Sequence, residues 1–477
     1  MAACLETPQV VTHEALSVFA AADAAHLAKR AIEPSSVRSL DGSPCMGRSA
    51  DGIALAYDGK CTDLGESYAY APAMDGSHGH TPLSFLPNRS SLIASANREA
   101  VRHADALRSA IEALQFPAGA ASLHCGRQVV DRPVFYMHLL PQVGFGSVIE
   151  YAIMFLARGL AIGAPMRLGP DSSVAWTSEW FCGARRSVTC YFNLSSCCAV
   201  MRPPGKARPL LLPRRRDPIN VAATGFNEYG SAWISAQLAR FLFDRMTPPT
   251  RAQLDRRRSG TLAELWMRPH AAGTARGGGG GERPLVIGMH IRRGDSCHKR
   301  RFCPSNLTSS YFAAAARLRA VYGANRLLLA TDDAEAARLC ALHVLGFECT
   351  TQSIERRKFE SAELIENRVA RHEEGDLSGS AVALDALADI DMLADCDMFV
   401  LLLRSCFARV AYALAMGRKG RPPPVISLEA PWSPHRGFKM KAMNMALRNG
   451  QGGKAAMMRQ MLKPNMDRRS AKMMSRP

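Results

Sequence analysis

The sequence has no apolar stretch long enough to cross a membrane. Its most apolar segments, residues 148–163 and 398–403, are interrupted or short, whereas a transmembrane helix needs about 20 predominantly apolar residues. The N-terminus lacks the basic start and the apolar core of a secretory signal peptide and begins Met-Ala-Ala-Cys-Leu-Glu. We therefore expect neither a membrane anchor nor a cleaved leader in this chain.

The sequence also lacks any pair of cysteines with two residues between them, although it contains 14 cysteines. This absence excludes zinc-ribbon spacing. The cysteines are either buried thiols or disulfide partners, and the sequence leaves both readings open. Among the cysteines that lie close together in the chain are the pairs Cys182 with Cys190, Cys297 with Cys303, and Cys340 with Cys349.

Negative charge is in deficit, because 60 Lys and Arg face 42 Asp and Glu and give a net charge of +18. Such a balance can indicate nucleic-acid binding. Here, however, much of the basic excess lies in residues 202–216 and 439–477, and the apolar segments between them are not unusually basic. We therefore expect no nucleic-acid partner and keep that class only as an alternative.

The length of 477 residues and the hydrophobic content of 47% predict two or three domains with cores of their own. No repeat of fixed period is present. Composition divides the chain into a variable, partly disordered N-terminal region (1–128), a first Rossmann-like domain (129–270), a glycine-rich linker (271–283), a second Rossmann-like domain (284–437), and a basic, Met-rich tail (438–477).

Strands and helices alternate in the second half of the chain. Apolar runs predict strands at residues 285–291, 326–331, 398–403 and 425–428, and helical periodicity predicts helices at 311–322, 334–345, 380–394 and from 406 to a stop at Gly417. In the first half, a helix is predicted at 96–114. A strand at 134–140, a loop containing Gly144 and Gly146, and a helix at 148–160 begin the first α/β unit, and a further helix is predicted at 231–245. This alternation predicts an α/β fold with doubly wound parallel sheets.

Polar clusters follow three of the predicted strands, where open α/β sheets bind their ligands. The first is His-Ile-Arg-Arg-Gly-Asp at residues 290–295. Arg292 and Arg293 can hold a diphosphate through charge-assisted hydrogen bonds and stabilise it as a leaving group. His290 adjoins an apolar run and is equally well explained as a core histidine.

The second cluster holds Asp332 and Asp333, which can orient the arginines, cap the next helix or bind a metal; the cap is the simplest reading. In the third, Ser405 begins a helix after a buried strand, at a place suited to phosphate or to an ordinary cap. Asp385 and Asp389 share a helix face and either recognise a base or ribose or form a solvated acidic face.

Residues 290–295, residues 330–333 and residues 389–412 together resemble the three peptide motifs of the α1,6-fucosyltransferase family, glycosyltransferase family 23. The third segment keeps the family's spacing, with eight residues from its first aspartate to Asp397 and twelve more to Arg409. The glycine loop and the helix near residue 231 are similar to the family's first domain. The resemblance covers roughly residues 133–430 and is strongest after residue 284.

The resemblance implies a GT-B fold of two facing Rossmann-like domains, with GDP-β-L-fucose as donor. It implies inverting transfer to a glycan or glycoprotein acceptor, foremost α1,6-fucosylation of N-glycans, with no divalent metal and no other cofactor. It leaves a homodimer open. By this analogy His290 and Asp389 recognise guanine, Arg292 binds the diphosphate, Arg293 supports it, and Ser405 holds the β-phosphate. Asp295 joins the two arginines as catalytic, and the remaining donor-site residues are Asp332, Asp333, Arg409, Gly144 and Gly146.

The chain departs from the family at three positions. Ser296 replaces a lysine, Cys406 replaces a glutamine, and residues 297–301 (Cys-His-Lys-Arg-Arg) lack the family's proposed general-base glutamate. Asp295 and His298 are the candidates for the base. Two alternatives therefore remain besides a nucleic-acid-binding protein: a protein O-fucosyltransferase-like enzyme and a non-catalytic member that binds nucleotide or glycan.

The resemblance implies a Golgi-lumen location. The family's membrane anchor, coiled coil and C-terminal SH3 domain are not visible in this chain. Sequons at Asn88, Asn193 and Asn306 favour the secretory pathway only slightly.

Overall fold

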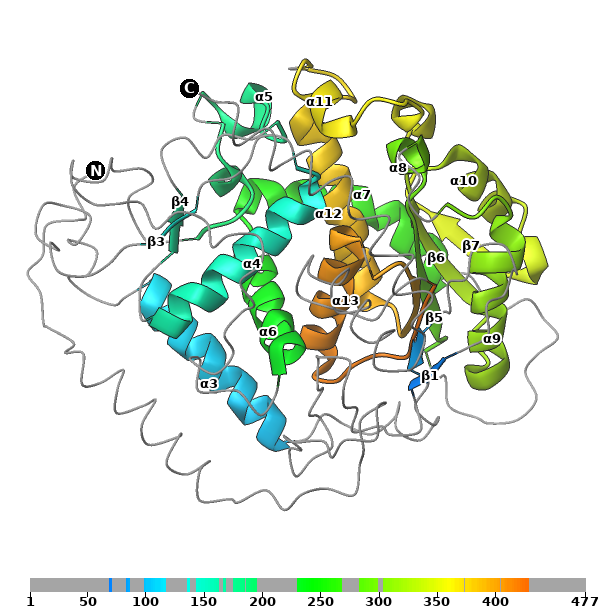
Figure 1. The fold of residues 1–477 in the computed structure, drawn as a ribbon, viewed down its shortest axis with the longest axis horizontal. Helices are drawn as coiled ribbons and strands as arrows, with labels where there is room; N and C mark the ends of the chain where they lie inside the picture. The colour runs from blue at the N-terminus through cyan, green and yellow to red at the C-terminus, as the bar shows by residue number, and fades with distance from the viewer. Residues whose placement is uncertain are drawn as a thin grey trace, which may run out of the picture.

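The computed structural model has an α/β fold built on a largely parallel sheet (Figure 1). It describes residues 68–70, 83–85, 98–116, 135–137, 143–162, 166–168, 175–184, 186–194, 230–267, 283–298, 303–372, 374–403 and 405–428. Most of the predicted N-terminal region, nearly all of the glycine-rich segment and the whole basic tail lie outside these residues.

The main sheet has the strand order β1-β2-β9-β8-β5-β6-β7. Its parallel strands are β5 (Val286–Ile291), β6 (Arg326–Thr331), β7 (Glu348–Thr351), β8 (Met398–Leu401) and β9 (Val425–Ser427). Two short strands, β1 (Tyr68–Tyr70) and β2 (Leu83–Phe85), continue the sheet in antiparallel pairing beyond β9. The parallel strands confirm the predicted α/β class, whereas β1 and β2 come from a region for which no regular structure was expected.

Helices cover both faces of this sheet. The helices of this half of the chain are α8 (Gly294–His298), α9 (Ala313–Tyr322), α10 (Ala334–Ala341), α11 (Ile365–Val369), α12 (Gly379–Asp395) and α13 (Cys406–Lys419), with short turns η5 (Thr308–Phe312), η6 (Val344–Gly346) and η7 (Arg356–Phe359). Because successive side chains of a strand point to opposite faces, Ile287 and Met289 pack in the core on the α9 side, while Val286 belongs to the core that contains α12 and α13.

The first half of the chain contains a small two-stranded parallel sheet. Its strands are β3 (Phe135–Met137) and β4 (Met166–Leu168), and α4 (Phe145–Ile162) connects them. The other elements are α3 (Arg98–Gln115), α5 (Glu179–Cys182), η2 (Val188–Cys190), α6 (Gly230–Asp244) and α7 (Pro248–Met267). The β3-α4-β4 unit confirms the predicted strand, glycine loop and helix. Among the described residues no helix combines the length and apolarity that a membrane span requires.

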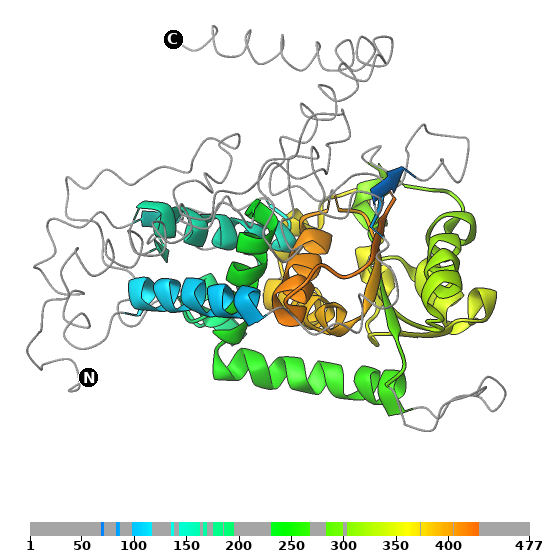
Figure 2. The same ribbon diagram turned by 90° about the horizontal axis from the view of Figure 1, so that it is seen from below.

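The two halves share one hydrophobic core. Helices α12 and α13 lie between the main sheet and α3, α4 and α6 (Figure 1), and α7 packs against α12 and the β6–β7 edge (Figure 2). Helix α13 lies close against α6, where a Cβ atom at Gly417 would lie 2.3 Å from the carbonyl oxygen of Ala236. Gly417 is therefore a packing residue between helices.

A predicted helix end was wrong, and one helix was not predicted. Gly417 does not end the last helix, because α13 continues to Lys419 and ends at Gly420, whose φ of 68° suits glycine. Pro248 does end the preceding helix, but it also begins α7, a helix that was not predicted. Proline is well tolerated in a first helical turn, where its missing N–H would have no partner.

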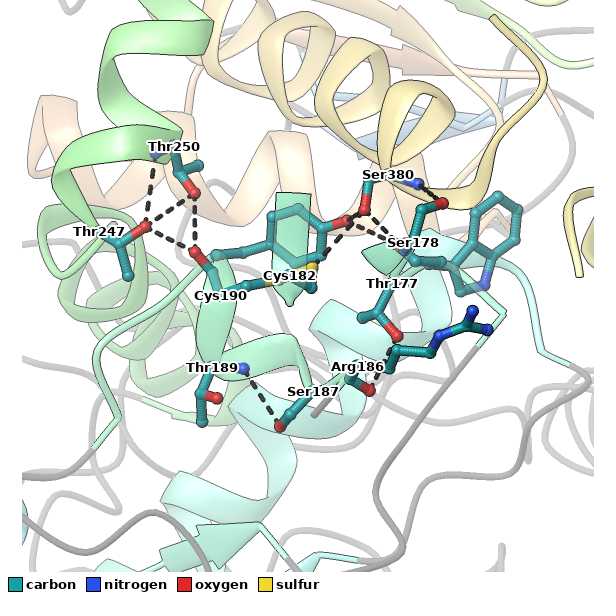
Figure 3. The surroundings of a disulfide bond; sticks show 12 residues. Thr177, Ser178, Cys182, Arg186, Ser187, Thr189, Cys190, Thr247, Thr250 and Ser380 are labelled. Atoms are coloured by element: carbon teal, nitrogen blue, oxygen red, sulfur yellow. Dashed lines mark hydrogen bonds between the residues drawn. A yellow bond between two sulfur atoms is a disulfide. The ribbon is translucent and has the colours of Figure 1, made fainter. Parts of the chain in front are cut away.

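The three close cysteine pairs are disulfide bonds in the structure. The Cys182–Cys190 bond closes the segment that meets the start of α12 (Figure 3). There the backbone N–H of Ser178 donates to Ser380 Oγ at 2.8 Å, and the N–H of Ser380 donates to Ser178 Oγ at 3.1 Å. These reciprocal bonds attach the disulfide-closed segment to the N-terminus of α12.

Candidate functional site

The strand order changes direction at β5. From β5 the chain moves outward through β6 to β7, then returns to the other side of β5 for β8 and β9. In open α/β sheets, ligands bind beyond the carboxyl ends of the strands at such a switch point. Here the two strands on either side of it lead into Arg292 and Ser405, so two of the three predicted clusters flank the expected ligand position.

Two carboxylates hold the guanidinium of Arg292 at the end of β5. Arg292 forms ion pairs with Asp332, at the end of β6, and with Asp295, one helical turn away. Burial disfavours the charge of Arg292, but Asp332, Asp295 and Glu366 outweigh burial and raise its pKa. Arg292 therefore remains a cation with a fixed orientation, as binding a diphosphate requires.

Gly294 allows this arrangement. A Cβ atom at Gly294 would lie 2.5 Å from Oδ2 of Asp332, so any larger residue would push that carboxylate away. The backbone N–H of Arg293 also donates to Oδ1 of Asp332 at 2.8 Å. Asp332 thus orients both arginines of the first motif, one through its side chain and the other through its backbone.

Asp333 has the role that the simplest reading gave it. Its carboxylate accepts a hydrogen bond from the N–H of Ala336 at 2.7 Å and caps α10. The same carboxylate lies 3.3 Å from the guanidinium of Arg293. The two aspartates therefore act as partners of arginine and backbone groups. Among the described residues, no cluster of His, Cys, Asp and Glu could hold a metal ion.

His290 is a neutral, buried ring on the α13 face of the sheet. Its side chain is only 4% exposed, and burial followed by the charge of Arg292 lowers its pKa to about 3. The ring stacks on Phe407 with 4.5 Å between centroids. No described group is hydrogen-bonded to its Nδ1 atom. His290 therefore combines a core position with an unsatisfied polar atom, which is unusual for a purely structural histidine.

Asp389 is also buried near the site. Desolvation raises its pKa to about 8, although the charge of Arg356 opposes the shift. Its helical neighbour Asp385 behaves differently and pairs with Arg257 at 2.9 Å and with Lys358 at 3.4 Å. The two aspartates do not form the solvated acidic face that was the simpler reading. Asp385 belongs to an ion-pair network, and Asp389 is a carboxyl group without its own hydrogen-bonded partner among the described residues.

Ser405 and Arg409 begin α13. Ser405 occupies the N-cap position, but its side chain makes no capping hydrogen bond. Arg409 is directed to α4, where it donates to both carboxylate oxygens of Glu150 at 2.5 and 2.7 Å and also to the carbonyl oxygen of Leu403 at 3.0 Å. Burial opposes its charge, but Glu150 and Cys406 outweigh burial and raise its pKa. Arg409 thus fixes the loop before Ser405.

The predicted glycine loop meets the start of α13 through Gly146. A Cβ atom there would lie 2.6 Å from the backbone nitrogen of Phe407. Ser147 adds a hydrogen bond of 3.1 Å from Oγ to Cys406 Sγ. Gly144 has open space around it. The N-termini of α4 and α13 therefore approach each other, and backbone N–H groups of helix N-termini attract anions.

Sequence reasoning did not identify two charged residues of this region, Arg356 and Glu366. Both follow β7, a strand whose sequence Glu-Cys-Thr-Thr lacks an apolar run and was not predicted. Arg356 is buried and acts on both Asp389 and Asp332. Glu366 is buried and acts on Arg292. Of the two candidates for the base, Asp295 is buried in its ion pair with Arg292, and the side chain of His298 is outside the described part.

No protein-family model matches the chain. No curated protein matches it either. Among solved structures, it is similar to the α1,6-fucosyltransferase NodZ soaked with GDP-fucose, with 12% sequence identity, 63% of this chain and 100% of that chain covered, and a TM-score of 0.34. A NodZ structure from Bradyrhizobium matches with 13% identity, 59% and 92% coverage and a TM-score of 0.33. TM-scores of this size carry no conclusion about fold or activity.

Proposed function

We propose that this protein is a fucosyltransferase that uses GDP-fucose as donor and a glycan as acceptor. The observation that carries the proposal is the position of Arg292. It lies at the switch point of the sheet, paired with Asp332 and Asp295, opposite the N-terminus of α13. The cation follows β5, and the helix N-terminus follows the neighbouring strand β8. A diphosphate between them could contact both groups.

The leaving group of the reaction explains why these groups would matter. When the bond between fucose and the β-phosphate breaks, negative charge builds on GDP, and Arg292 and the backbone N–H groups after Ser405 would stabilise it. Arg293 would support Arg292. This chemistry needs no metal, so we expect a metal-independent enzyme. Inversion of configuration at the fucose carbon is what the motif resemblance implies.

The guanine base would be recognised by His290 and Asp389. A neutral imidazole offers one donor and one acceptor, and the Nδ1 atom of His290 has no partner among the described groups. A carboxylate at residue 389 can accept two hydrogen bonds from the N–H groups of guanine. Ionised Asp389 is the form that does so. Burial favours the protonated form in the free protein, so guanine binding would have to ionise Asp389, and the charge of Arg356 assists that ionisation.

The finer assignments follow the motif resemblance. They are a GT-B arrangement of two facing domains, α1,6-fucosylation of N-glycans and a location in the Golgi lumen. One observation favours a second candidate, a non-catalytic member that binds GDP or a GDP-sugar: residues 297–301 contain no carboxylate to act as the general base.

Calorimetric titration of the full chain with GDP in the presence of EDTA tests the donor class, with UDP and ADP as controls. Selective GDP binding is the expected result. A folded protein that binds none of the three, or all three equally, would contradict the proposal. Transfer of radiolabelled fucose from GDP-fucose to a biantennary N-glycan then separates the enzyme from the non-catalytic candidate.

A further inference from the structure

The segment between β7 and α12 covers the end of β5. A Cβ atom at Gly294, directly after the two arginines, would lie 3.5 Å from the carbonyl oxygen of Phe359 in η7. The next helix, α11, is anchored by Ile365 and Val369, which are buried in the core that contains α12. In Figure 1, α11 lies beside α12 at the end of the molecule where α8 follows β5. This segment therefore brings side chains to Arg292 from a second direction.

Glu366 is one of them. Its side chain is 9% exposed, and its charge acts on the guanidinium of Arg292 in the same sense as those of Asp332 and Asp295. Unlike those two carboxylates, Glu366 accepts no hydrogen bond from any described residue and forms no ion pair with one. A buried carboxylate without a direct partner is costly for the folded state, so its presence calls for an explanation.

The nearby carboxylates are already occupied. Asp295 is ion-paired with Arg292, and Asp332 holds Arg292 and the backbone of Arg293. If either took a proton from a substrate, Arg292 would be released from a partner that fixes its orientation at the step when it must face the leaving group. Glu366 is the acidic side chain near Arg292 whose oxygens have no such task.

We propose that Glu366 is the general base of the reaction, contributed by α11 in place of the carboxylate missing from residues 297–301. This inference rests on the proposed fucosyltransferase function. The carboxylate of Glu366 takes the proton of an acceptor hydroxyl while the oxygen of that hydroxyl forms a bond to C1 of fucose. The bond from C1 to the β-phosphate oxygen breaks, its electron pair stays on GDP next to Arg292, and the proton on Glu366 later passes to water.

The test compares the full-length variants Glu366→Gln and Glu366→Asp with the wild type. General-base catalysis contributes roughly 10²–10⁴ in rate. Glu366→Gln should therefore lower kcat for transfer to a biantennary N-glycan by that factor, with unchanged GDP affinity by calorimetry. Glu366→Asp retains a carboxylate and should recover part of the rate. Glu363→Gln is the matched control. Glu363 lies three residues before Glu366 and is exposed, where it pairs with Arg371.

Sodium azide distinguishes a base from a positioning residue. Azide is an anionic nucleophile that has no proton to lose, so Glu366→Gln should form fucosyl azide from GDP-fucose at the wild-type rate. A Glu366→Gln variant that transfers to the N-glycan like the wild type would overturn the inference, as would one that loses GDP binding or azide transfer. A wild-type protein that binds GDP but transfers fucose to neither nucleophile would instead refute the proposed enzyme function.

Discussion

Gly146 at the start of α4 touches the backbone of Phe407 at the start of α13, with space for a hydrogen atom but not for a methyl group. Gly146→Ala should therefore separate the two helix ends and destabilise the protein by about 1–3 kcal/mol, the usual cost of overpacking. Chemical denaturation would measure the change. A matched control is Gly260→Ala in α7, where the added Cβ meets nothing within 4 Å.

The control should change stability in the opposite direction, because alanine is favoured over glycine inside helices by about 1 kcal/mol. Equal effects of the two substitutions would show that α4 and α13 do not approach each other as closely as the structure has them. The GDP affinity of Gly146→Ala should also fall, since both helix N-termini belong to the proposed phosphate site.

Arg292→Ala should lower both GDP affinity and stability. Its removal leaves the largely buried carboxylates of Asp332 and Asp295 without their partner, and leaving buried charges unpaired in this way costs about 3–5 kcal/mol. Arg292→Lys keeps the charge but not the planar fork, so it should recover more stability than GDP affinity. Calorimetry with GDP and denaturant unfolding measure the two effects separately.

The exposed pair of Arg338 and Glu335 provides the comparison for Arg292. Arg338→Ala should cost less than about 1 kcal/mol and leave GDP binding unchanged. If Arg292→Ala were as mild as this control and bound GDP normally, Arg292 would be neither a structural partner of the two aspartates nor a phosphate ligand.

Asp389 should make the protein less stable as pH rises. Its pKa is about 8 in the folded protein, above an unfolded value of about 4. Between these two values the folded state binds more protons than the unfolded state, so the free energy of unfolding falls with increasing pH by up to about 1.4 kcal/mol per unit. The loss is complete above pH 8 and absent below pH 4.

Asp389→Asn removes this ionisation. Its free energy of unfolding, relative to that of the wild type, should increase steadily from pH 5 to pH 8 in denaturant titrations. The control is Asp376→Asn, which removes an exposed carboxylate before α12 and should show no such trend. A constant difference between Asp389→Asn and the wild type at all pH values would contradict burial of an uncharged Asp389. Because the proposed guanine site uses this carboxylate, the same variant should bind GDP weakly.

The sequence predicted the elements whose cause is local. β6 has the predicted limits, because Arg-Leu-Leu-Leu-Ala-Thr is an apolar run closed by a capping aspartate. The polar clusters at the ends of β5, β6 and β8 were also predicted, and the structure brings those of β5 and β6 into direct contact. Predicting the limits of β6 and the polar clusters at the strand ends required no information about distant parts of the chain.

Tertiary contacts determined the strand and the site contacts that the sequence did not predict. Among the described strands, β7 is a polar edge strand that pairs with β6 alone, so its sequence carries no burial signal. Glu366 belongs to no motif, and its nearness to Arg292 depends on how the β7–α12 segment folds back over β5. Arg409 was predicted to bind the donor, and its partner Glu150 lies 259 residues away. No spacing rule could have paired them.

That pair of Glu150 and Arg409 supports the last prediction. Both side chains are largely buried, and they join α4 to α13, the helix whose N-cap is Ser405. Glu150→Gln and Arg409→Gln should each destabilise the protein by about 3–5 kcal/mol, because each leaves a buried charge alone. The double variant should cost less than the sum of the two, with a coupling energy of about 0.5–3 kcal/mol.

The same double-mutant cycle on Glu363 and Arg371, an ion pair of exposed side chains, should give a coupling of about 0–1 kcal/mol. A coupling of that small size for Glu150 and Arg409 would contradict the buried bidentate pair. Since Arg409 also holds the carbonyl oxygen of Leu403, Arg409→Gln should release the loop before Ser405 and weaken GDP binding more than Glu150→Gln does. Equal GDP affinities in the two variants would show that Arg409 stabilises the joint between the helices without shaping the proposed phosphate site.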